Sequence, residues 1–153
     1  LLASSAASDV YKRQDYNSIY KVKKDIKIEY ENDGKKEYSI NGIENRIEQM
    51  IANLLDNSIS FTEKGGKIIV NISITSNKKI IVKIIDEGQG FKEKDTSKIF
   101  RRFYSNRPDK FGEHSGLGLN IVKNLVELHD GKIVASNRPN NKGAIMEISF
   151  PSM

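Results

Sequence analysis

The sequence predicts an α/β (α+β) two-layer sandwich, in which a mixed, mostly antiparallel sheet of about five strands carries about three helices on one face. Runs of β-branched residues bounded by turn residues indicate the strands. Two longer segments place apolar residues at the helical period of 3.6. A connection rich in charge, glycine and proline lies between them, and so long an irregular segment in a compact domain is typical of a functional lid.

The first third of the chain predicts two strands and a helix. Alternating residues indicate a strand over 25–31, and a shorter strand is expected at 37–40 after a turn that contains glycine. Asn41 has Glu44 three residues later and resembles an N-cap box, so we expect a helix from there to about Ser60. Its apolar positions follow the helical period: Ile43, Ile47, Met50, Ile51, Leu54 and Leu55.

The remaining two thirds predict a hairpin, the lid, a second long helix and a final strand pair. The hairpin joins 67–75 to 79–85, and the lid spans 87–115 with a short helix around 96–103. The second long helix is expected over 115–128, and the last strands over 132–136 and 144–150.

Composition excludes several classes of protein. The chain has 153 residues, no Cys and no Trp, which suits one domain with a hydrophobic core and excludes disulfides. No apolar run approaches the roughly 18 residues that span a bilayer, so we expect no direct membrane contact. The net charge of +5 arises from Lys spread along the chain and predicts no nucleic-acid partner.

The chain is expected to consist of three segments of unequal length. Residues 9–14, Asp-Val-Tyr-Lys-Arg-Gln, can be encoded by a transposon end used to tag sequencing libraries, so we expect residues 1–14 to be translated adapter rather than native protein. Residues 15–24 are polar and are expected to be a linker from a missing upstream part. The folded domain is expected over 25–153.

Two clusters suit the metal and the base of a nucleotide. Asn53 and Asn57 are four apart and share a helix face, and an amide oxygen is a reasonable Mg²⁺ ligand; equally, they could be two solvent-facing residues. Asp86 ends a predicted strand, where a carboxylate can accept a hydrogen bond from the amino group of adenine. Gly88 and Gly90 would allow the backbone to approach the base, although an ordinary turn explains them too.

Two further clusters suit the phosphates. Gly116 and Gly118 precede a helix, whose N-terminal N–H groups favour phosphate, and no Gly-Lys-Ser/Thr follows as in a P-loop. Arg102 and Arg107 lie in the lid and could clamp phosphates, or be solvated surface residues. Phe61 follows the first helix and could stack on a purine, or belong to the core.

The order Asn-x-x-x-Asn, Asp-x-Gly-x-Gly, Phe-x-Arg-Phe-Tyr and Gly-Leu-Gly-Leu resembles the catalytic ATP-binding domain of two-component sensor histidine kinases. These belong to a wider family with gyrase B, Hsp90 and MutL, whose Bergerat-type fold carries an ATP lid. The resemblance covers about Ile26 to Pro151. The segment 107–115 further resembles a sub-family of membrane sensors that govern envelope and exopolysaccharide genes.

The resemblance implies a role for each site residue. Asn57 would hold Mg²⁺, Asn53 would support the phosphates, and Asp86 would bind adenine with Phe61 near the base. The nucleotide site and its lid would also include Gly88, Gly90, Phe103, Tyr104, Gly116, Leu117, Gly118 and Leu119. Arg102 and Arg107 would meet the phosphates as catalytic residues with Asn53. Two positions depart from the family: Ser58 stands where Ala is usual, and Ser60 where many members have Lys.

The resemblance also distinguishes phosphoryl transfer to histidine from ATP hydrolysis. ATPase relatives carry Glu at the position of Asn53 as a general base, and a neutral amide cannot take that proton. We therefore expect ATP, bound with Mg²⁺, to donate its γ-phosphoryl group to a histidine on a separate helical hairpin. The alternative is an ATPase, or a degenerate ATP-binding regulatory module without kinase activity.

The same resemblance implies the setting of the domain. Its partners would be its own missing acceptor hairpin and a response regulator receiver domain. The full-length protein would be a homodimeric inner-membrane sensor, with this domain in the cytoplasm. His129-Asp130-Gly131 superficially resembles an acceptor sequence, but it lies where a helix is predicted to end, so we do not expect His129 to be the acceptor.

Overall fold

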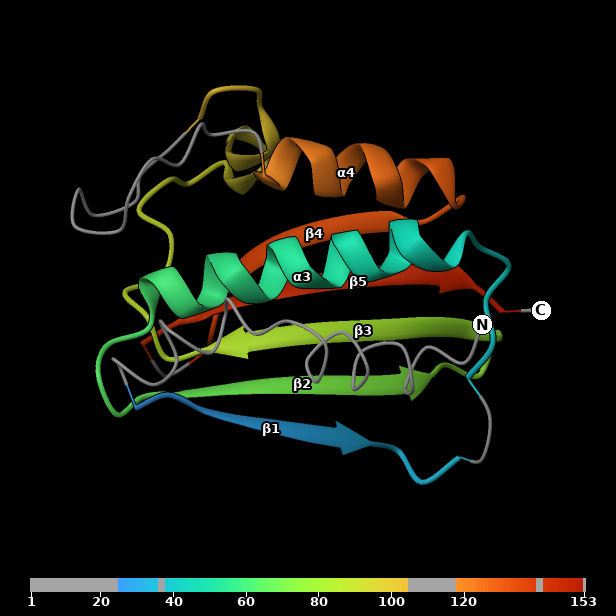
Figure 1. Cartoon of the computed structure of the whole chain (residues 1–153), viewed down its shortest axis with the longest axis horizontal. Coiled ribbons are helices and arrows are strands. Elements are labelled where there is room, and N and C mark those ends of the chain that lie inside the picture. The colour runs from blue at the N-terminus through green and yellow to red at the C-terminus, as the bar shows by residue number, and fades with distance from the viewer. Residues whose placement is uncertain (1–24, 36–37, 105–117, 140–141, 153) are drawn as a thin grey trace.

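Five strands form one mixed sheet in the order β1-β2-β3-β5-β4 (Figure 1). The computed structural model describes residues 25–35, 38–104, 118–139 and 142–152. The strands are β1 (Lys27–Asn32), β2 (Lys67–Ile74), β3 (Lys79–Asp86), β4 (Lys132–Asn137) and β5 (Ala144–Pro151). Strands β1 and β2 are parallel, and the other neighbouring pairs are antiparallel, as the sequence predicts.

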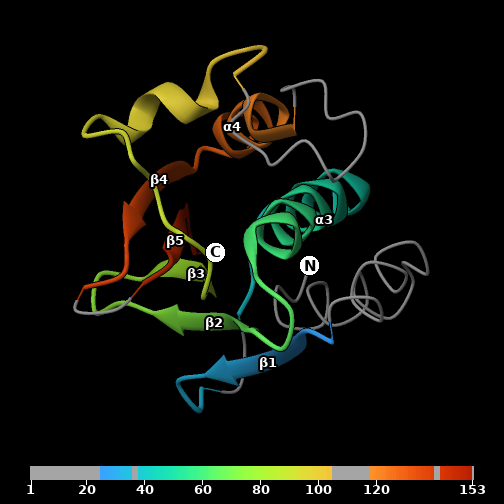
Figure 2. The ribbon, with the colours of Figure 1, turned by 90° about the vertical axis from the view of Figure 1, so that its left-hand side faces the viewer.

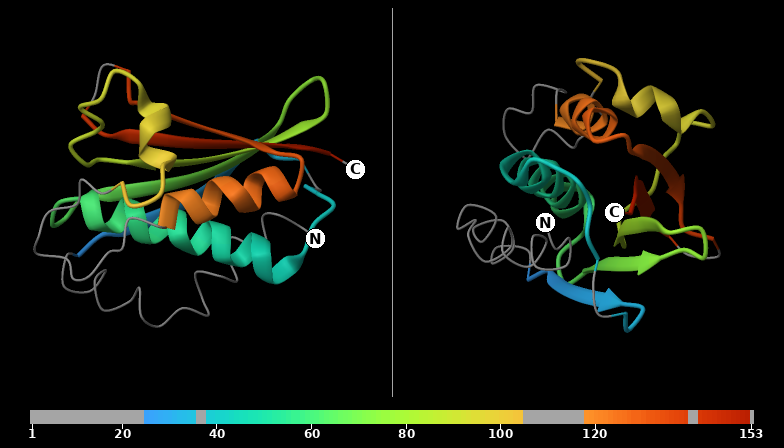
Figure 3. Two further views of the ribbon diagram at one scale, coloured as in Figure 1. Left: turned by 90° about the horizontal axis from the view of Figure 1, so that it is seen from above. Right: turned by 90° about the vertical axis from the view of Figure 1, so that its right-hand side faces the viewer.

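Two α-helices of the described chain, α3 (Glu44–Phe61) and α4 (Gly118–Leu128), cover one face of the sheet, and η1 (Thr96–Phe100) adds a short 3-10 helix. Figure 2 shows α3 and α4 against the same face, and Figure 3 shows that they run antiparallel beside each other. The predicted two-layer sandwich is thus confirmed. No described helix combines the length and apolar character needed to cross a bilayer.

Buried and less buried residues alternate along the central strands, and the buried ones form the core together with the helices. One face of the central strands is buried: Ile68, Val70, Ile72, Ile80, Val82, Ile84, Met146, Ile148 and Phe150. On α3, Met50 and Leu54 are fully buried and meet this face. Helix α3 lies in the connection between β1 and β2, which is why these two strands can be parallel.

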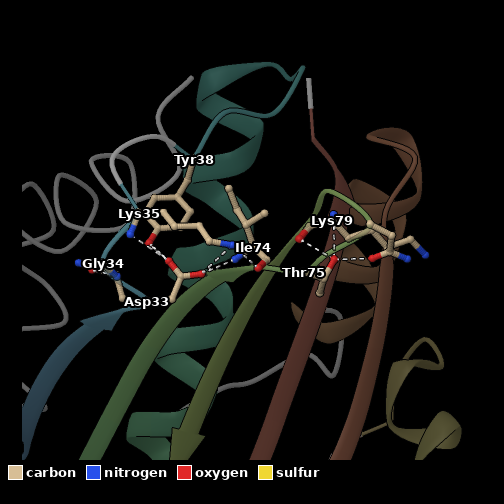
Figure 4. A network of polar contacts seen from close by, with 9 residues as sticks. Asp33, Gly34, Lys35, Tyr38, Ile74, Thr75 and Lys79 are labelled. Carbon is tan, nitrogen blue, oxygen red and sulfur yellow. Dashed lines mark hydrogen bonds and ion pairs between the residues drawn. The ribbon is translucent and has the colours of Figure 1, made fainter.

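The prediction of a strand over 37–40 is wrong. Among the described residues of this range, Ser39 alone forms a β-bridge, and none forms a strand. A polar network holds this segment instead (Figure 4). The Tyr38 hydroxyl donates a hydrogen bond to Asp33, whose other carboxylate oxygen accepts from Ile74 N at 2.8 Å. The Lys35 ammonium donates to Ile74 O at 2.9 Å. These contacts tie the chain after β1 to the end of β2.

The predicted capping box at Asn41 is also wrong. Helix α3 begins at Glu44 with Ile43 as its N-cap, and no side chain caps it. Instead, Ile43 N donates to Nε2 of His129 at 3.1 Å, and Nδ1 of that ring donates to Leu125 O at 2.6 Å. The buried His129 therefore joins the start of α3 to the end of α4. The Ile43 side chain is 55% exposed rather than part of the core.

The role of His129 can be measured as stability. We expect His129→Leu to lower the free energy of unfolding by about 1–3 kcal/mol, because it leaves two partly buried backbone groups without a partner. Urea denaturation compares the variant with Leu128→Ala, a neighbouring side chain that is 62% exposed. The control should cost less than about 0.5 kcal/mol. Equal losses in the two variants would mean that the ring does not join the helices.

Candidate nucleotide site

The most buried charged group of the described chain lies at the end of β3. Asp86 is 2% exposed, and its Oδ1 accepts hydrogen bonds from Gly88 N at 2.9 Å and Ala144 N at 3.3 Å. No backbone N–H group of a described residue donates to its second oxygen, Oδ2, and a side-chain hydrogen bond from Ser58 also acts on the carboxyl group. An ionised carboxylate has about four acceptor sites, so the group keeps acceptor capacity for another molecule.

Burial dominates the electrostatics of this carboxyl group. Burial raises the pKa of Asp86 above its usual value. The Gly88 and Ala144 N–H groups, the Ser58 hydroxyl and the Arg138 guanidinium act in the opposite sense and lower this pKa. The net direction is upward, so the ionised form is destabilised in the folded protein. A hydrogen-bond donor from a ligand would relieve that cost.

Helix α3 brings its polar residues to this end of the sheet. Asn57 is 6% exposed and Asn53 is partly exposed, so the interpretation of two solvent-facing residues fails for Asn57. The last turns of α3 are buried on nearly all sides: Leu54, Leu55, Asn57, Ser58, Ile59 and Ser60. The sequence pattern predicted a polar face opposite the apolar stripe. The structure instead encloses that face over its last two turns.

The glycines after Asp86 allow close contact with two other elements, Gly88 with the end of α3 and Gly90 with the end of β4. A Cβ at Gly88 would lie 2.7 Å from the carbonyl oxygen of Phe61, and no real side chain tolerates that distance. Gly90 has φ of +77°, and a Cβ there would lie 2.7 Å from Asn137 Oδ1. The structure therefore brings Asp86, Gly88 and the Phe61 backbone together. The stacking of the Phe61 ring on a base remains a prediction.

Sequence reasoning missed two residues that fix this geometry. Gly143 has φ of +134°, and a Cβ there would lie 2.0 Å from the Asp86 carbonyl oxygen. In the sequence, the feature that could have indicated this residue was the position of a glycine directly before a predicted strand. The Asn137 side chain accepts from Phe91 N at 2.6 Å and donates to Phe91 O at 2.9 Å, which holds the loop after Gly90. Nothing in the sequence pattern pointed to Asn137.

The beginning of the lid is anchored at η1. Ile99 and Phe100 are buried, and Asn120 of α4 donates to Phe100 O at 3.0 Å. Phe103 is 70% exposed, with the guanidinium of Arg102 lying 5.5 Å from its ring centroid. The described Arg102 thus contacts an aromatic ring, and its phosphate role remains a prediction.

The structure describes some of the other predicted lid residues and not the rest. The Tyr104 hydroxyl donates to Glu93, and this contact raises the pKa of Tyr104 to about 12. Gly118 is the first residue of α4, and Leu119 packs against the core. Arg107, Gly116 and Leu117 lie outside the described residues, as do residues 1–14 and 15–24.

Residues 42–153 match the family described as histidine kinase-, DNA gyrase B- and HSP90-like ATPase. The chain belongs to this family. Its sequence relatives are sensor kinases. They include the sensor protein ChvG of Agrobacterium fabrum, 37% identical over 135 residues, which cover 84% of this chain and 22% of that protein. The sensor protein KdpD of Clostridium acetobutylicum is 43% identical over 108 residues, or 69% of this chain and 12% of that protein.

Solved structures agree with the sequence relatives. The catalytic domain of histidine kinase ThkA has a TM-score of 0.79 at 26% identity and covers 96% of this chain and 90% of that one. The mycobacterial sensor histidine kinase MprB has a TM-score of 0.82 at 22% identity, covers 99% of this chain and 95% of that one, and shows the shared fold. The chain spans about a fifth of the length of the ChvG relatives and corresponds to the catalytic domain of a histidine kinase.

The contact at Gly143 gives a test of the site geometry. We expect Gly143→Ala to lower the free energy of unfolding by about 3 kcal/mol or more, because it combines backbone strain with a steric clash. Gly65→Ala is the matched control, since Gly65 also has positive φ but no atom within 4 Å of a Cβ. It should cost only about 1 kcal/mol. Similar losses in urea denaturation would show that the contact with Asp86 is unimportant.

Proposed function

We propose that this chain binds Mg-ATP and donates the γ-phosphoryl group to a histidine on a separate helical hairpin, as the catalytic domain of a sensor histidine kinase. The observation that carries the proposal is the buried Asp86 carboxylate. One of its oxygens is held by two backbone N–H groups, and the other accepts no backbone hydrogen bond from the described residues. An amino group on a purine would supply a further donor, and adenine presents one where guanine presents a carbonyl.

The residues present fit a magnesium nucleotide. The Asn57 amide oxygen would be the protein ligand of Mg²⁺, which prefers oxygen and usually keeps several waters and phosphate oxygens. Asn53, one turn earlier, would meet the phosphates. Arg102, Arg107, Gly116 and Gly118 would complete phosphate binding, with donors that neutralise charge without acting as a base. When bound, Mg²⁺ would supply further neutralisation of the phosphate charge.

Asn53 favours phosphoryl transfer over hydrolysis. An amide cannot accept the proton of an attacking water, so ATP stays intact until another nucleophile arrives. The imidazole of an acceptor histidine would attack the γ-phosphorus. The bond to the β,γ-bridging oxygen would break, ADP would leave with the electron pair, and the imidazole would lose its proton to solvent. His129 is unsuited to be that acceptor, because it is buried and both ring nitrogens are engaged.

The proposed partners follow from the relatives. They are a helical hairpin that carries the acceptor histidine, a second copy of the protein, and a response regulator receiver domain. A solved structure of histidine kinase ThkA in complex with response regulator protein TrrA, with a TM-score of 0.77, supports the last of these. We propose a location on the cytoplasmic side of an inner-membrane sensor. Similarity to two ChvG sensor proteins supports the narrower sub-family of envelope sensors.

Asp86→Asn separates binding from folding. We expect ATP affinity to fall about ten- to a hundredfold, because the amide presents an N–H group to the adenine amino group and a charge-assisted hydrogen bond is lost. Calorimetric titration with ATP and GTP gives the measurement. The Asn oxygen can still accept from Gly88 N and Ala144 N, so the fold should survive. Unchanged ATP affinity, or a preference of the wild type for GTP, would contradict the adenine contact.

The pH dependence of the free energy of unfolding tests the burial of the Asp86 carboxyl group without any nucleotide. Burial raises the folded-state pKa of Asp86 above its unfolded value, so its ionisation destabilises the folded protein at pH above the folded-state pKa. That cost disappears as the pH falls below the unfolded value. At neutral pH, Asp86→Asn should therefore be at least as stable as the wild type, and this difference should shrink in acid.

Transfer can be tested with the purified chain. Mixed with Mg-ATP labelled in the γ-phosphate and with a cognate helical hairpin, it should label the hairpin histidine. The phosphoryl bond should be labile in acid and stable in alkali, as expected for a phosphorus–nitrogen bond. The chain alone should bind ATP, hydrolyse it slowly and not label itself. Tight ATP binding without labelling of the hairpin would favour the degenerate module.

Asn53→Glu tests why ATP stays intact. A carboxylate at this position should raise the hydrolysis rate if the geometry of the ATPase relatives is shared. Asn53→Gln is the matched control, because it lengthens the side chain equally without adding a base. Brisk hydrolysis by the wild type would favour the ATPase alternative.

A further inference from the structure

Three pairs of residues in the described chain have a sequence that can rearrange its own backbone. In Asn-Gly and Asp-Gly pairs, the backbone nitrogen of the glycine can attack the preceding side-chain carbonyl carbon and close a five-membered succinimide ring. Glycine favours this reaction because it has no side chain to obstruct the approach. The described residues contain Asn41-Gly42, Asp33-Gly34 and Asp130-Gly131.

The structure restrains both Asp-Gly pairs. Gly34 N donates to Asn32 Oδ1 at 2.9 Å, and Gly131 N donates to Val126 O at 2.9 Å. The carboxylate of Asp33 is also held in the polar network of Figure 4. In each pair a hydrogen bond occupies the attacking nitrogen, so we expect neither ring to close in the folded protein.

The Asn-Gly pair differs from both Asp-Gly pairs. Asn41 and Gly42 are exposed and lie just before the start of α3. Gly42 N and the Asn41 side-chain amide form no hydrogen bond with any described residue. An amide is also attacked more readily than a carboxylate, because its carbonyl carbon belongs to a neutral group and ammonia can leave. The attacking atom and the attacked atom are therefore both accessible in this pair.

We propose that Asn41 is a site of spontaneous modification, which converts it in the folded protein to aspartyl and isoaspartyl residues. Gly42 N gives up its proton to solvent and bonds to the Asn41 side-chain carbonyl carbon. The side-chain nitrogen leaves as ammonia, with a proton from water. Water then opens the ring: attack at the side-chain carbonyl gives aspartate, and attack at the backbone carbonyl gives isoaspartate. The modification would occur whether or not the chain binds ATP.

The position of this pair gives the isoaspartyl form a structural consequence. A Cβ on Gly42 would lie 3.0 Å from His129 Cδ2 and 3.3 Å from Ile47 Cδ1, so the backbone packs closely where α3 meets α4. The next residue, Ile43, donates its N–H group to His129 Nε2 at 3.1 Å. An isoaspartyl linkage adds one methylene group to the main chain and should displace Ile43 from the ring. The aspartyl form adds only a charge near a helix N-terminus, which the helix dipole favours.

The experiment ages the purified chain in mildly alkaline buffer at body temperature and follows its tryptic peptides by mass spectrometry. Peptide 37–46 should gain the mass difference between an amide and a carboxylic acid at Asn41. An isoaspartyl methyltransferase should then methylate this peptide. Peptides 28–35 and 124–132 carry the Asp-Gly pairs and should remain unmethylated. The same incubation in urea removes the restraints, so all three peptides should then be methylated.

Two variants distinguish the altered linkage from the added charge. Asn41→Gln should resist the reaction, because closure would require a larger ring. Freshly purified Asn41→Asp carries the charge of the product on an ordinary main chain. Aged wild-type protein should contain a fraction that melts about 2–8 °C lower, the shift expected from the loss of one hydrogen bond. Aged Asn41→Gln and fresh Asn41→Asp should show no such fraction.

Three results would count against this proposal. If Asn41 is modified in urea but not in the folded protein, the fold protects the pair and the proposal is overturned. Equal isoaspartate at the folded Asp-Gly pairs would show that the hydrogen bonds of their nitrogens give no protection. Modified wild-type protein with an unchanged melting temperature would remove the link between Asn41 and the contact of His129 with Ile43.

Discussion

The burial of one carboxylate at the end of β3 constrains the surrounding structure. Asp86 can be buried only because two backbone N–H groups reach its Oδ1. One comes from the loop that Gly88 begins, and the other from Ala144 at the start of β5. The antiparallel register of β3 and β5, which pairs Ile85 with Ile145, brings Ala144 to this position. Gly143 then lies against the Asp86 carbonyl, where a side chain has no room.

Helix α3 links the core to the site. Its early turns supply apolar residues such as Met50 to the sheet, and its last turns carry Asn57 and Ser58 to the end of β3. Two contacts hold its ends. His129 fixes the start against α4, and Thr62 closes the end through the Ser58 carbonyl. A rigid helix held at both ends can position amide and hydroxyl groups accurately, which positional catalysis and base recognition both require.

The chemistry that this arrangement supports depends on neutral groups. Asn53 and Asn57 offer oxygens to a metal and N–H groups to phosphates, and neither can activate water. The described residues hold no cluster of three or more His, Asp or Glu side chains suited to a metal. These features agree with the proposed phosphoryl transfer, in which a separate hairpin would supply the nucleophile.

The sequence by itself determined the fold class, the strands of the hairpin and the order of the nucleotide motifs, because hydrophobic period and glycine placement are local properties. It was wrong about the strand at 37–40 and the cap at Asn41, where distant partners, Ile74 and His129, outweighed local signals. Only the tertiary structure decided that Asn57 and Ser58 are enclosed, and that Gly143 and Asn137 fix the loop at Asp86. Burial and close approach arise between segments far apart in the chain, and no local pattern records them.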